Sequence, residues 1–180
     1  MSFRSAFEDT VGLEGGFGKD PDDSGNWTGG KIGVGILKGT KYGISAAAYP
    51  DLDIENLTIE QAHALYKRDY WDVLKLDSIP NERVQEELFD TGVNMGIGAS
   101  AKILQRSINF LEMGNPLDED GAIGPKTIEK AVYWCNKDPE ALYRALNGFQ
   151  FIRYYEIAVV GSVKEKYARG WMKRIQDYRQ

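Results

Sequence analysis

Glu14 and Asp23 are two acidic residues that could carry chemistry, because their sequence surroundings differ sharply. Phe3, Phe7 and Val11 recur every four residues, which predicts the apolar stripe of a first helix. Glu14 continues that stripe, and Gly15 and Gly16 then end the predicted helix. A carboxyl at the C-terminal end of a helix meets the negative end of the helix dipole, and apolar surroundings also disfavour its charge. We therefore expect Glu14 to be protonated and able to act as a general acid.

Asp23 lies in a polar segment rich in glycine, where a carboxylate stays hydrated and ionised. Seven glycines fall between Gly25 and Gly43, so this stretch must adopt backbone conformations that a Cβ atom disfavours. One protonated and one ionised carboxyl form the general arrangement that cleaves a glycosidic bond. Glutamate followed by glycine is also common at exposed helix ends, and on this pattern alone an exposed helix-end residue is the better interpretation of Glu14.

Other catalytic arrangements are excluded by composition. Among 180 residues there is one cysteine, Cys135, and one histidine, His63. A single cysteine forms no intramolecular disulfide, and the usual ligand sets for zinc, haem and iron–sulfur centres are missing. Triads that place histidine beside a serine or cysteine nucleophile are likewise disfavoured, because His63 is expected to serve packing or the surface. We expect neither a metal nor another cofactor.

The charge balance bears on the choice of partner. The formal net charge is -5 and the pI is about 5.0, which argues against nucleic-acid binding because that requires clustered lysine and arginine. No run of eighteen apolar residues occurs, so no stable membrane insertion is expected.

Helical signals dominate the chain after residue 44. Thr58 with Gln61 predicts a capping box, and Asn81 predicts the cap of the next helix. Proline at two N1 positions predicts helices over 125–136 and 139–160. Between 20 and 44 the helical period vanishes, and an alternating stretch, Ile32 to Ile36, predicts a short strand. The expected fold is mainly α, a single compact domain over 1–180 with a small β wing near 20–44.

Short motifs in the first quarter of the chain form a series. They are E-G-G-F at 14–17, D-P-D-D at 20–23, Gly25, Thr28 and T-K-Y-G-I at 40–44. This series resembles the signature of glycoside hydrolase family 108, whose members are lysozyme-like N-acetylmuramidases and include many endolysins of phages that infect Gram-negative bacteria. The chain departs from the family pattern by Gly25-Asn26-Trp27 in place of a glycine pair and by an insertion over 28–39.

The resemblance continues through most of the chain, roughly residues 5 to 175. The segments F-D at 89–90, V-N at 93–94 and L-Q at 104–105 are similar to a helical part of the family pattern. The run D-G-A-I-G-P-K-T at 120–127 is similar to an element of the family's C-terminal peptidoglycan-binding region. The resemblance thus implies a catalytic region over 1–95 and a helical, peptidoglycan-binding-like region over 96–180 packed on it.

Site roles follow from the resemblance. Glu14 would be the general acid, and Asp23 with Thr40 would hold a water or stabilise the cationic transition state. Thr28 is the alternative to Thr40, because the insertion lies between them. Whether Asp23 acts as base, nucleophile or electrostatic support depends on the separation of the two carboxyls. Four further residues are predicted to bind the glycan: Trp27, Tyr42, Asn94 and Gln105. For Asn94 and Gln105, a helix cap or a buried amide network is an equal alternative.

The activity implied by the resemblance is hydrolysis of the β-1,4 bond between N-acetylmuramic acid and N-acetylglucosamine. A lytic transglycosylase and a non-catalytic protein that binds peptidoglycan or assists secretion are the alternatives. The expected partner is the peptidoglycan glycan strand, and the expected state is a monomer. With no apolar segment of signal length, we expect the protein to stay in the host cytoplasm until a holin-type factor releases it to the cell wall.

Overall fold

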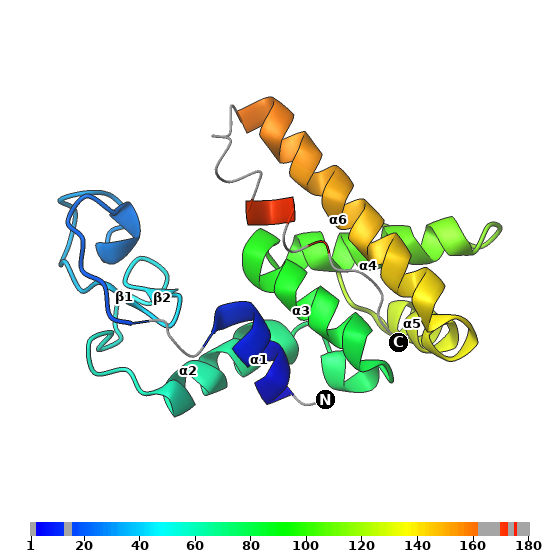
Figure 1. The fold of residues 1–180 in the computed structure, drawn as a ribbon, viewed down its shortest axis with the longest axis horizontal. Coiled ribbons are helices and arrows are strands. Elements are labelled where there is room, and N and C mark those ends of the chain that lie inside the picture. The colour runs from blue at the N-terminus through cyan, green and yellow to red at the C-terminus, as the bar shows by residue number, and fades with distance from the viewer. Residues whose placement is uncertain (1–2, 13–15, 162–169, 173–174, 176–180) are drawn as a thin grey trace. The chain divides into compact units, whose positions relative to one another are not determined.

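Helices make up most of the structure, a computed structural model that describes residues 3–12, 16–161, 170–172 and 175 (Figure 1). A two-stranded antiparallel sheet is formed near the N-terminal end of the chain. The fold is mainly α and lysozyme-like with a small β wing, as the sequence predicts. Contacts divide the chain into two units, Met1–Asp69 and Tyr70–Gln180, and each is described separately.

In the first unit, two helices pack through aromatic side chains. Helix α1 spans Phe3–Val11 and helix α2 spans Ile59–Tyr66. Phe7 is fully buried, and its ring lies 4.4 Å from that of His63 and 5.2 Å from that of Tyr66, both edge to face. The capping box between Thr58 and Gln61 is present, as predicted. His63 therefore serves packing in this unit.

Helix α1 ends earlier than the sequence pattern predicts. Its last residue is Val11, and Gly12 follows with φ of +79°, a left-handed conformation that commonly ends helices. The prediction that the later glycine pair stops this helix is therefore wrong, because Gly12 stops it. Glu14, which was predicted in the last turn, lies outside the described residues.

The wing is a tight hairpin. Strand β1, Thr40–Lys41, pairs antiparallel with strand β2, Ile44–Ser45. Tyr42 and Gly43 connect the strands, and both have positive φ, 50° and 73°, which is the signature of a type I′ turn. The Tyr66 hydroxyl donates to the Tyr42 carbonyl at 3.1 Å and so holds this non-glycine residue in its left-handed conformation.

The strand predicted over Ile32 to Ile36 does not form. Turns and bends occupy residues 31–35, and the side chains of Ile32 and Ile36 are 59% and 64% exposed. The reason is that Gly33 and Gly35, which supply the alternation, adopt positive φ of 76° and 83° and bend the chain. The period of two thus reflects a glycine-rich turn and not a pleated strand.

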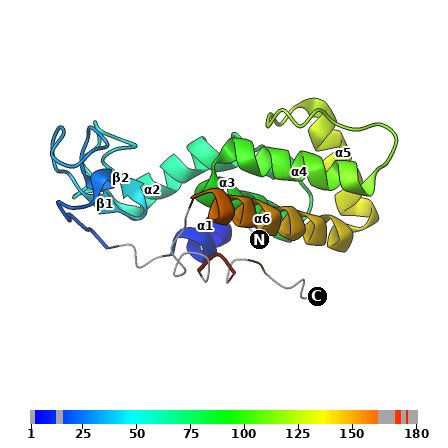
Figure 2. The same ribbon diagram turned by 90° about the horizontal axis from the view of Figure 1, so that it is seen from above.

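The second unit is built from four long helices: α3 (Glu82–Met95), α4 (Ile97–Leu111), α5 (Pro125–Lys137) and α6 (Pro139–Gly161). Helices α3, α4 and α6 pack side by side in both ribbon views, and α5 packs against α4 and α6 (Figures 1 and 2). Two short elements precede them, the π-helix η2 (Lys67–Trp71) and the 3-10 helix η3 (Leu76–Ser78). The division between the two units falls within η2. None of the described helices is both long and apolar enough to cross a membrane.

The predicted helix starts in this unit are confirmed. The Asn81 side chain accepts from the amide of Val84 at the start of α3. Pro125 opens α5, and the Asp138 carboxylate accepts from the amide of Ala141 at the start of α6. Local capping signals therefore set these boundaries.

A polar cluster lies inside the helical core of the second unit. Glu87 on α3 is only 4% exposed, and its carboxyl accepts from the Thr91 hydroxyl at 3.4 Å. The Thr91 hydroxyl in turn accepts from Gln150 of α6 at 2.9 Å. Burial, together with the charge of Asp90, raises the pKa of Glu87 to about 8. Glu87 is therefore a neutral carboxylic acid at neutral pH.

The raised pKa of Glu87 makes stability depend on pH. Below pH 4.5 the carboxyl is protonated in both the folded and the unfolded chain, whereas from about pH 4.5 to 8 only the unfolded chain loses the proton, so stability falls as pH rises. Glu87→Gln removes this loss. From pH 5 to pH 8, the free energy of unfolding of the variant should therefore rise by at least about 1.4 kcal/mol relative to that of the wild type. Urea unfolding at pH 5 and at pH 8 measures the change. Glu140→Gln, on the exposed ion pair with Arg144, is the control, and parallel pH profiles for Glu87→Gln and the wild type would contradict the prediction.

Candidate active site

The first acidic motif of the wing forms a compact turn. The Asp20 carboxylate accepts from the amide of Asp22 at 2.9 Å, and Asp23 caps the 3-10 helix η1, Ser24–Asn26. One oxygen of Asp23, Oδ1, accepts from the amide of Gly25 at 2.9 Å. Asp23 is exposed, so its second oxygen faces solvent. The cap thus fixes the carboxylate while leaving it able to bind a water molecule or a sugar hydroxyl.

Asn26 connects this turn to the hairpin. It is 3% exposed, its Nδ2 donates to the Asp20 carbonyl at 2.9 Å, and its Oδ1 accepts from the Thr40 hydroxyl at 2.7 Å. Its main-chain carbonyl accepts from the amides of Lys38 and Gly39 at 2.9 Å and 3.1 Å. A buried amide with these partners holds Asp23 and Thr40 on one rigid frame.

Thr40 is fixed on both its main chain and its side chain. Its amide and carbonyl exchange hydrogen bonds with Gly18 at 2.8 Å and 2.9 Å. Because its hydroxyl proton is donated to Asn26, the lone pairs of Oγ1 are left to accept a proton from a bound water or hydroxyl. The Gly18 pairing also places Thr40 next to the segment that follows Glu14 in the sequence.

Thr28 has a different local role. Its hydroxyl accepts from the amide of Ile36 at 2.9 Å, and its own amide donates to the Ile36 carbonyl at 3.0 Å. These bonds close the base of the inserted loop. Of the two threonines, Thr40 is the one that shares a hydrogen-bond network with the D-P-D-D turn.

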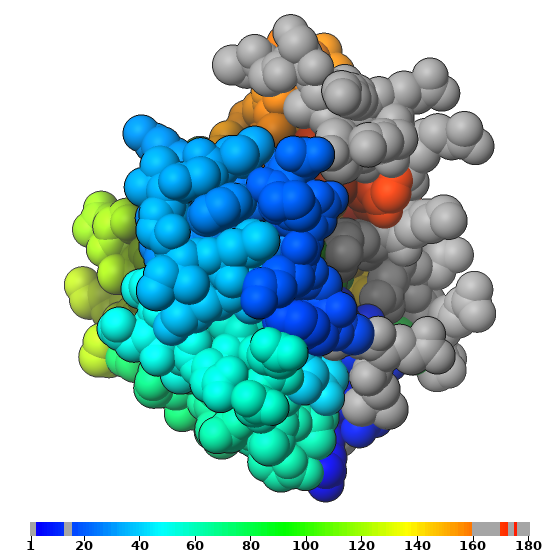
Figure 3. All heavy atoms as spheres, turned by 90° about the vertical axis from the view of Figure 1, so that its left-hand side faces the viewer, coloured from blue at the N-terminus to red at the C-terminus, as the bar shows by residue number. Residues whose placement is uncertain are grey.

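The two aromatic residues predicted to bind glycan also belong to the wing, whose atoms are drawn in blue and cyan in Figure 3. The Trp27 indole N–H donates to the Pro21 carbonyl at 2.9 Å, so this side chain holds the D-P-D-D turn in place. Tyr42 lies at the hairpin turn, with the Lys41 ammonium 5.5 Å from its ring centroid. Both side chains are half-buried, and their contact with a glycan stays a prediction.

Asn94 and Gln105 lie in the second unit and differ in exposure. Asn94 is exposed, and its Nδ2 donates to the Asp90 carbonyl at 2.8 Å within α3. Gln105 is 2% exposed; its Nε2 donates to the Asp120 carboxylate and the Ala122 carbonyl, and its Oε1 accepts from the amide of Gly121. Of the two alternatives, glycan binding and a buried amide network, Gln105 has the second, because its amide is buried and its oxygen and nitrogen are both hydrogen-bonded within the protein.

The loop that Gln105 holds is the D-G-A-I-G-P-K-T run. The Ala122 amide and then the Gln105 side chain, both hydrogen-bonded to the Asp120 carboxylate, hold its pKa below the usual range. Gly121 has φ of +80°, and an added Cβ would lie 3.0 Å from the Gly98 carbonyl oxygen. The motif therefore packs the entry of α5 against α4.

Two residues that hold the wing in place were missed by sequence reasoning. Asn26 drew attention only as a departure from the family's glycine pair, and Tyr66 of helix α2 was not singled out. The departure itself was a usable signal, because an amide in a glycine-rich turn can bond to several main-chain groups at once.

The wing therefore brings Asp23, Thr40, Trp27 and Tyr42 together in one unit, through Asn26 and the hairpin. Glu14 lies outside the described residues, and its role as general acid stays a prediction. Among the described residues, no group of three or more histidine, cysteine, aspartate or glutamate side chains could hold a metal ion.

Comparison with known proteins agrees with this architecture. A solved structure of Brucella abortus SagA superposes with a TM-score of 0.68 at 23% identity, covering 96% of this chain and 88% of that chain. No curated protein matches the sequence. The glycosyl hydrolase 108 family matches residues 7–96, half of the chain, and a family described as a predicted peptidoglycan domain matches residues 99–176. The chain thus belongs to the glycosyl hydrolase 108 family, and joins its glycosidase region to a peptidoglycan-binding region.

Proposed function

We propose that this glycoside hydrolase is an N-acetylmuramidase, which hydrolyses the β-1,4 bond between N-acetylmuramic acid and N-acetylglucosamine. Family membership supports cleavage of a glycosidic bond, and the second matched region supports peptidoglycan as the substrate. The observation that carries the choice of hydrolysis is the Thr40 hydroxyl, whose proton is donated to Asn26. An oxygen fixed in this way accepts a proton from a water molecule and so orients the water for attack.

The reaction uses two carboxyls with different tasks. Glu14 donates its proton to the glycosidic oxygen, so the bond from that oxygen to C1 of N-acetylmuramic acid breaks and the N-acetylglucosamine residue leaves with its 4-hydroxyl. The developing positive charge on the muramic ring is stabilised by the Asp23 carboxylate. Water held between Asp23 and Thr40 supplies the new hydroxyl at C1. The proton that this water loses passes to the carboxylate of Asp23 or to that of Glu14, which is ionised once it has protonated the leaving oxygen.

Analysis of the products tests the choice of hydrolysis. Purified sacculi are digested, the soluble fragments are reduced with borohydride, and mass spectrometry identifies their ends. A muramidase leaves N-acetylmuramic acid as a free reducing end, which borohydride reduces. Fragments ending in 1,6-anhydro-N-acetylmuramic acid would show that the enzyme is a transglycosylase and not a hydrolase. Reducible N-acetylglucosamine ends would show that it cleaves the bond from N-acetylglucosamine to N-acetylmuramic acid instead.

For the biological role, we propose lysis of a bacterial host by a phage endolysin held in the cytoplasm until a holin-type factor opens the membrane. The resemblance of the motif series to phage endolysins supports this role. Expression of the chain alone in a Gram-negative host should leave cells intact, whereas permeabilising the inner membrane should cause rapid lysis. Lysis or export without permeabilisation would contradict the proposed route.

A further inference from the structure

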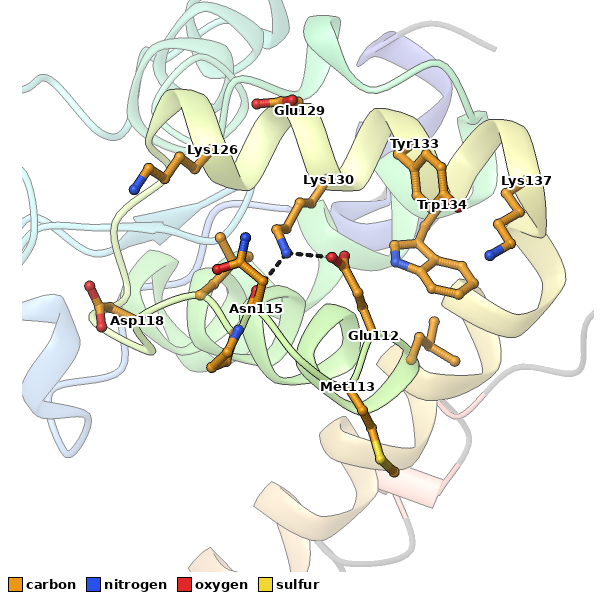
Figure 4. A pocket seen from close by; sticks show the side chains of 13 residues that line it. Glu112, Met113, Asn115, Asp118, Lys126, Glu129, Lys130, Tyr133, Trp134 and Lys137 are labelled. Atoms are coloured by element: carbon orange, nitrogen blue, oxygen red, sulfur yellow. Dashed lines mark hydrogen bonds and ion pairs between the residues drawn. The ribbon is translucent and has the colours of Figure 1, made fainter.

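A cavity lies in the peptidoglycan-binding region, well away along the chain from the residues of the wing. It has a volume of about 670 Å³ and is lined by the end of α4, the loop over 112–118 and one face of α5 (Figure 4). No role in the proposed cleavage falls on its lining residues.

The residues of α5 that line the cavity are spread along the whole length of the helix. They are Lys126, Glu129, Lys130, Tyr133, Trp134 and Lys137. The spacing from Lys126 to Lys137 is eleven residues, which is just over three full turns at about 100° per residue, so both lysines lie on the same face. At about 1.5 Å per residue they are separated by about 16 Å along the helix.

The opposite wall of the cavity is held in place by hydrogen bonds. The Leu117 main chain exchanges two bonds with the Asn109 side chain, at 2.7 Å and 2.9 Å. Lys130 donates to Glu112 at 2.8 Å and to the Asn115 carbonyl at 2.6 Å, and so ties this loop to α5. The cavity is therefore preformed, which lowers the entropic cost of binding.

The remaining charges of the cavity are balanced. Lys130 is paired with Glu112, whereas Lys126, Lys137, Asp118 and Glu129 have no ion-pair partner among the residues that the structure describes. Figure 4 shows Lys126 and Asp118 at one end and Lys137 at the other. Two unpaired cations and two unpaired acids favour a zwitterionic ligand over a neutral glycan or a polyanion.

The aromatic side chains point to the same choice. The Lys137 ammonium lies 4.7 Å from the Trp134 ring centroid and 5.2 Å from that of Tyr133, so it keeps a sugar ring from stacking on that face of the tryptophan. Trp134 is only 7% exposed, and its indole N–H has no acceptor among the described residues. In Figure 4 this nitrogen lies on the ring edge away from Lys137.

We infer that this cavity binds the peptide stem of peptidoglycan. The inference rests on the proposed function, since it names a second part of the same substrate. Stem peptides carry free carboxylates and, at an uncrosslinked diamino acid, an ammonium group, which matches the unpaired lysines and acids. An extended peptide of four or five residues spans about 14–17 Å, close to the separation of Lys126 and Lys137.

Calorimetric titration of the full chain tests the inference. The probes are the tetrapeptide L-Ala-γ-D-Glu-meso-diaminopimelyl-D-Ala and, separately, chitotetraose. Wild-type protein should bind the tetrapeptide, and Lys126→Met and Lys137→Met should each weaken the affinity about tenfold, as expected for loss of one charge-assisted hydrogen bond. Arg153→Met, which removes an exposed cation paired with Glu156 on α6, is the matched control and should bind as the wild type does.

Three results would overturn the inference: no binding of the tetrapeptide, equal affinity after both lysine substitutions, or chitotetraose binding that the lysine substitutions weaken. Circular dichroism checks that each variant is folded. The product analysis above is independent of this titration. Tetrapeptide binding without glycan cleavage would refute the proposed muramidase and support the peptide site, whereas cleavage without tetrapeptide binding would refute only the site.

Discussion

Glu14→Gln should lower the rate at which the protein solubilises purified peptidoglycan by about 10²–10⁴-fold, the usual contribution of a general acid. Glutamine has the size of glutamate but cannot donate a proton to the leaving oxygen, so binding to sacculi should persist. Turbidity clearing measures the rate, and co-sedimentation with sacculi measures binding.

A second acidic residue provides the control. Glu8 lies on helix α1 in an exposed ion pair with Arg4, so Glu8→Gln removes one carboxylate from the same segment without touching the proposed reaction. It should clear sacculi at the wild-type rate. If Glu14→Gln clears as fast as Glu8→Gln, Glu14 is not the acid and the proposed mechanism is wrong.

Gly39→Ala should disrupt the wing and with it the activity. Gly39 has φ of +89°, and an added Cβ would collide with the Gly18 carbonyl oxygen and lie 2.7 Å from Phe17 Cε2. The Gly18 carbonyl accepts from the Thr40 amide, so the collision breaks the bond that fixes Thr40. We expect activity to fall at least about tenfold, as expected from the loss of one group that positions the attacking water.

Gly33→Ala separates steric collision from backbone strain. Gly33 has a similar φ of +76°, but an added Cβ would meet nothing within 4 Å. Its cost should be the left-handed strain alone, about 1–2 kcal/mol, with activity retained. Hydrogen exchange at the Thr40 amide should be faster in Gly39→Ala and unchanged in Gly33→Ala. Equal exchange rates in the two variants would show that the Gly18 pairing does not depend on a glycine at position 39.

Local signals in the sequence were sufficient for the starts of several helices and insufficient for the end of α1 and for the wing. Caps at Thr58, Asn81 and Asp138 act within a few residues of the backbone that they bond, so their effect is readable from spacing alone. The alternation of Ile32 and Ile36 with glycine has two physical solutions, a strand or a chain of turns. Only the positive φ of the intervening glycines distinguishes the two, and the sequence does not determine whether a glycine adopts positive or negative φ.

The candidate site shows the same division. Motif order predicted Asp23 and Thr40 as site residues, and Asn26 joins the segments that carry them because it bonds to both the D-P-D-D turn and the hairpin. That link joins residues fourteen positions apart, and no periodicity marks it. Gln105 was placed correctly on a helix, but its choice between ligand and buried amide depended on the fold of the loop over 120–122.

The inserted loop, residues 28–39, is held at its base by hydrogen bonds and exposed at its tip. Its base is fastened by the bonds between Thr28 and Ile36 and by the Asn26 carbonyl, and each of these bonds involves at least one main-chain atom. The tip side chains, among them Ile32 and Val34, are exposed. Residues 31–34 can therefore be exchanged for an affinity tag or a labelling sequence while Thr40 keeps its position, because insertions are tolerated best at exposed loop tips. The tip of this loop is therefore a site at which the enzyme can be attached to a surface or a fluorophore without changing the rest of the wing.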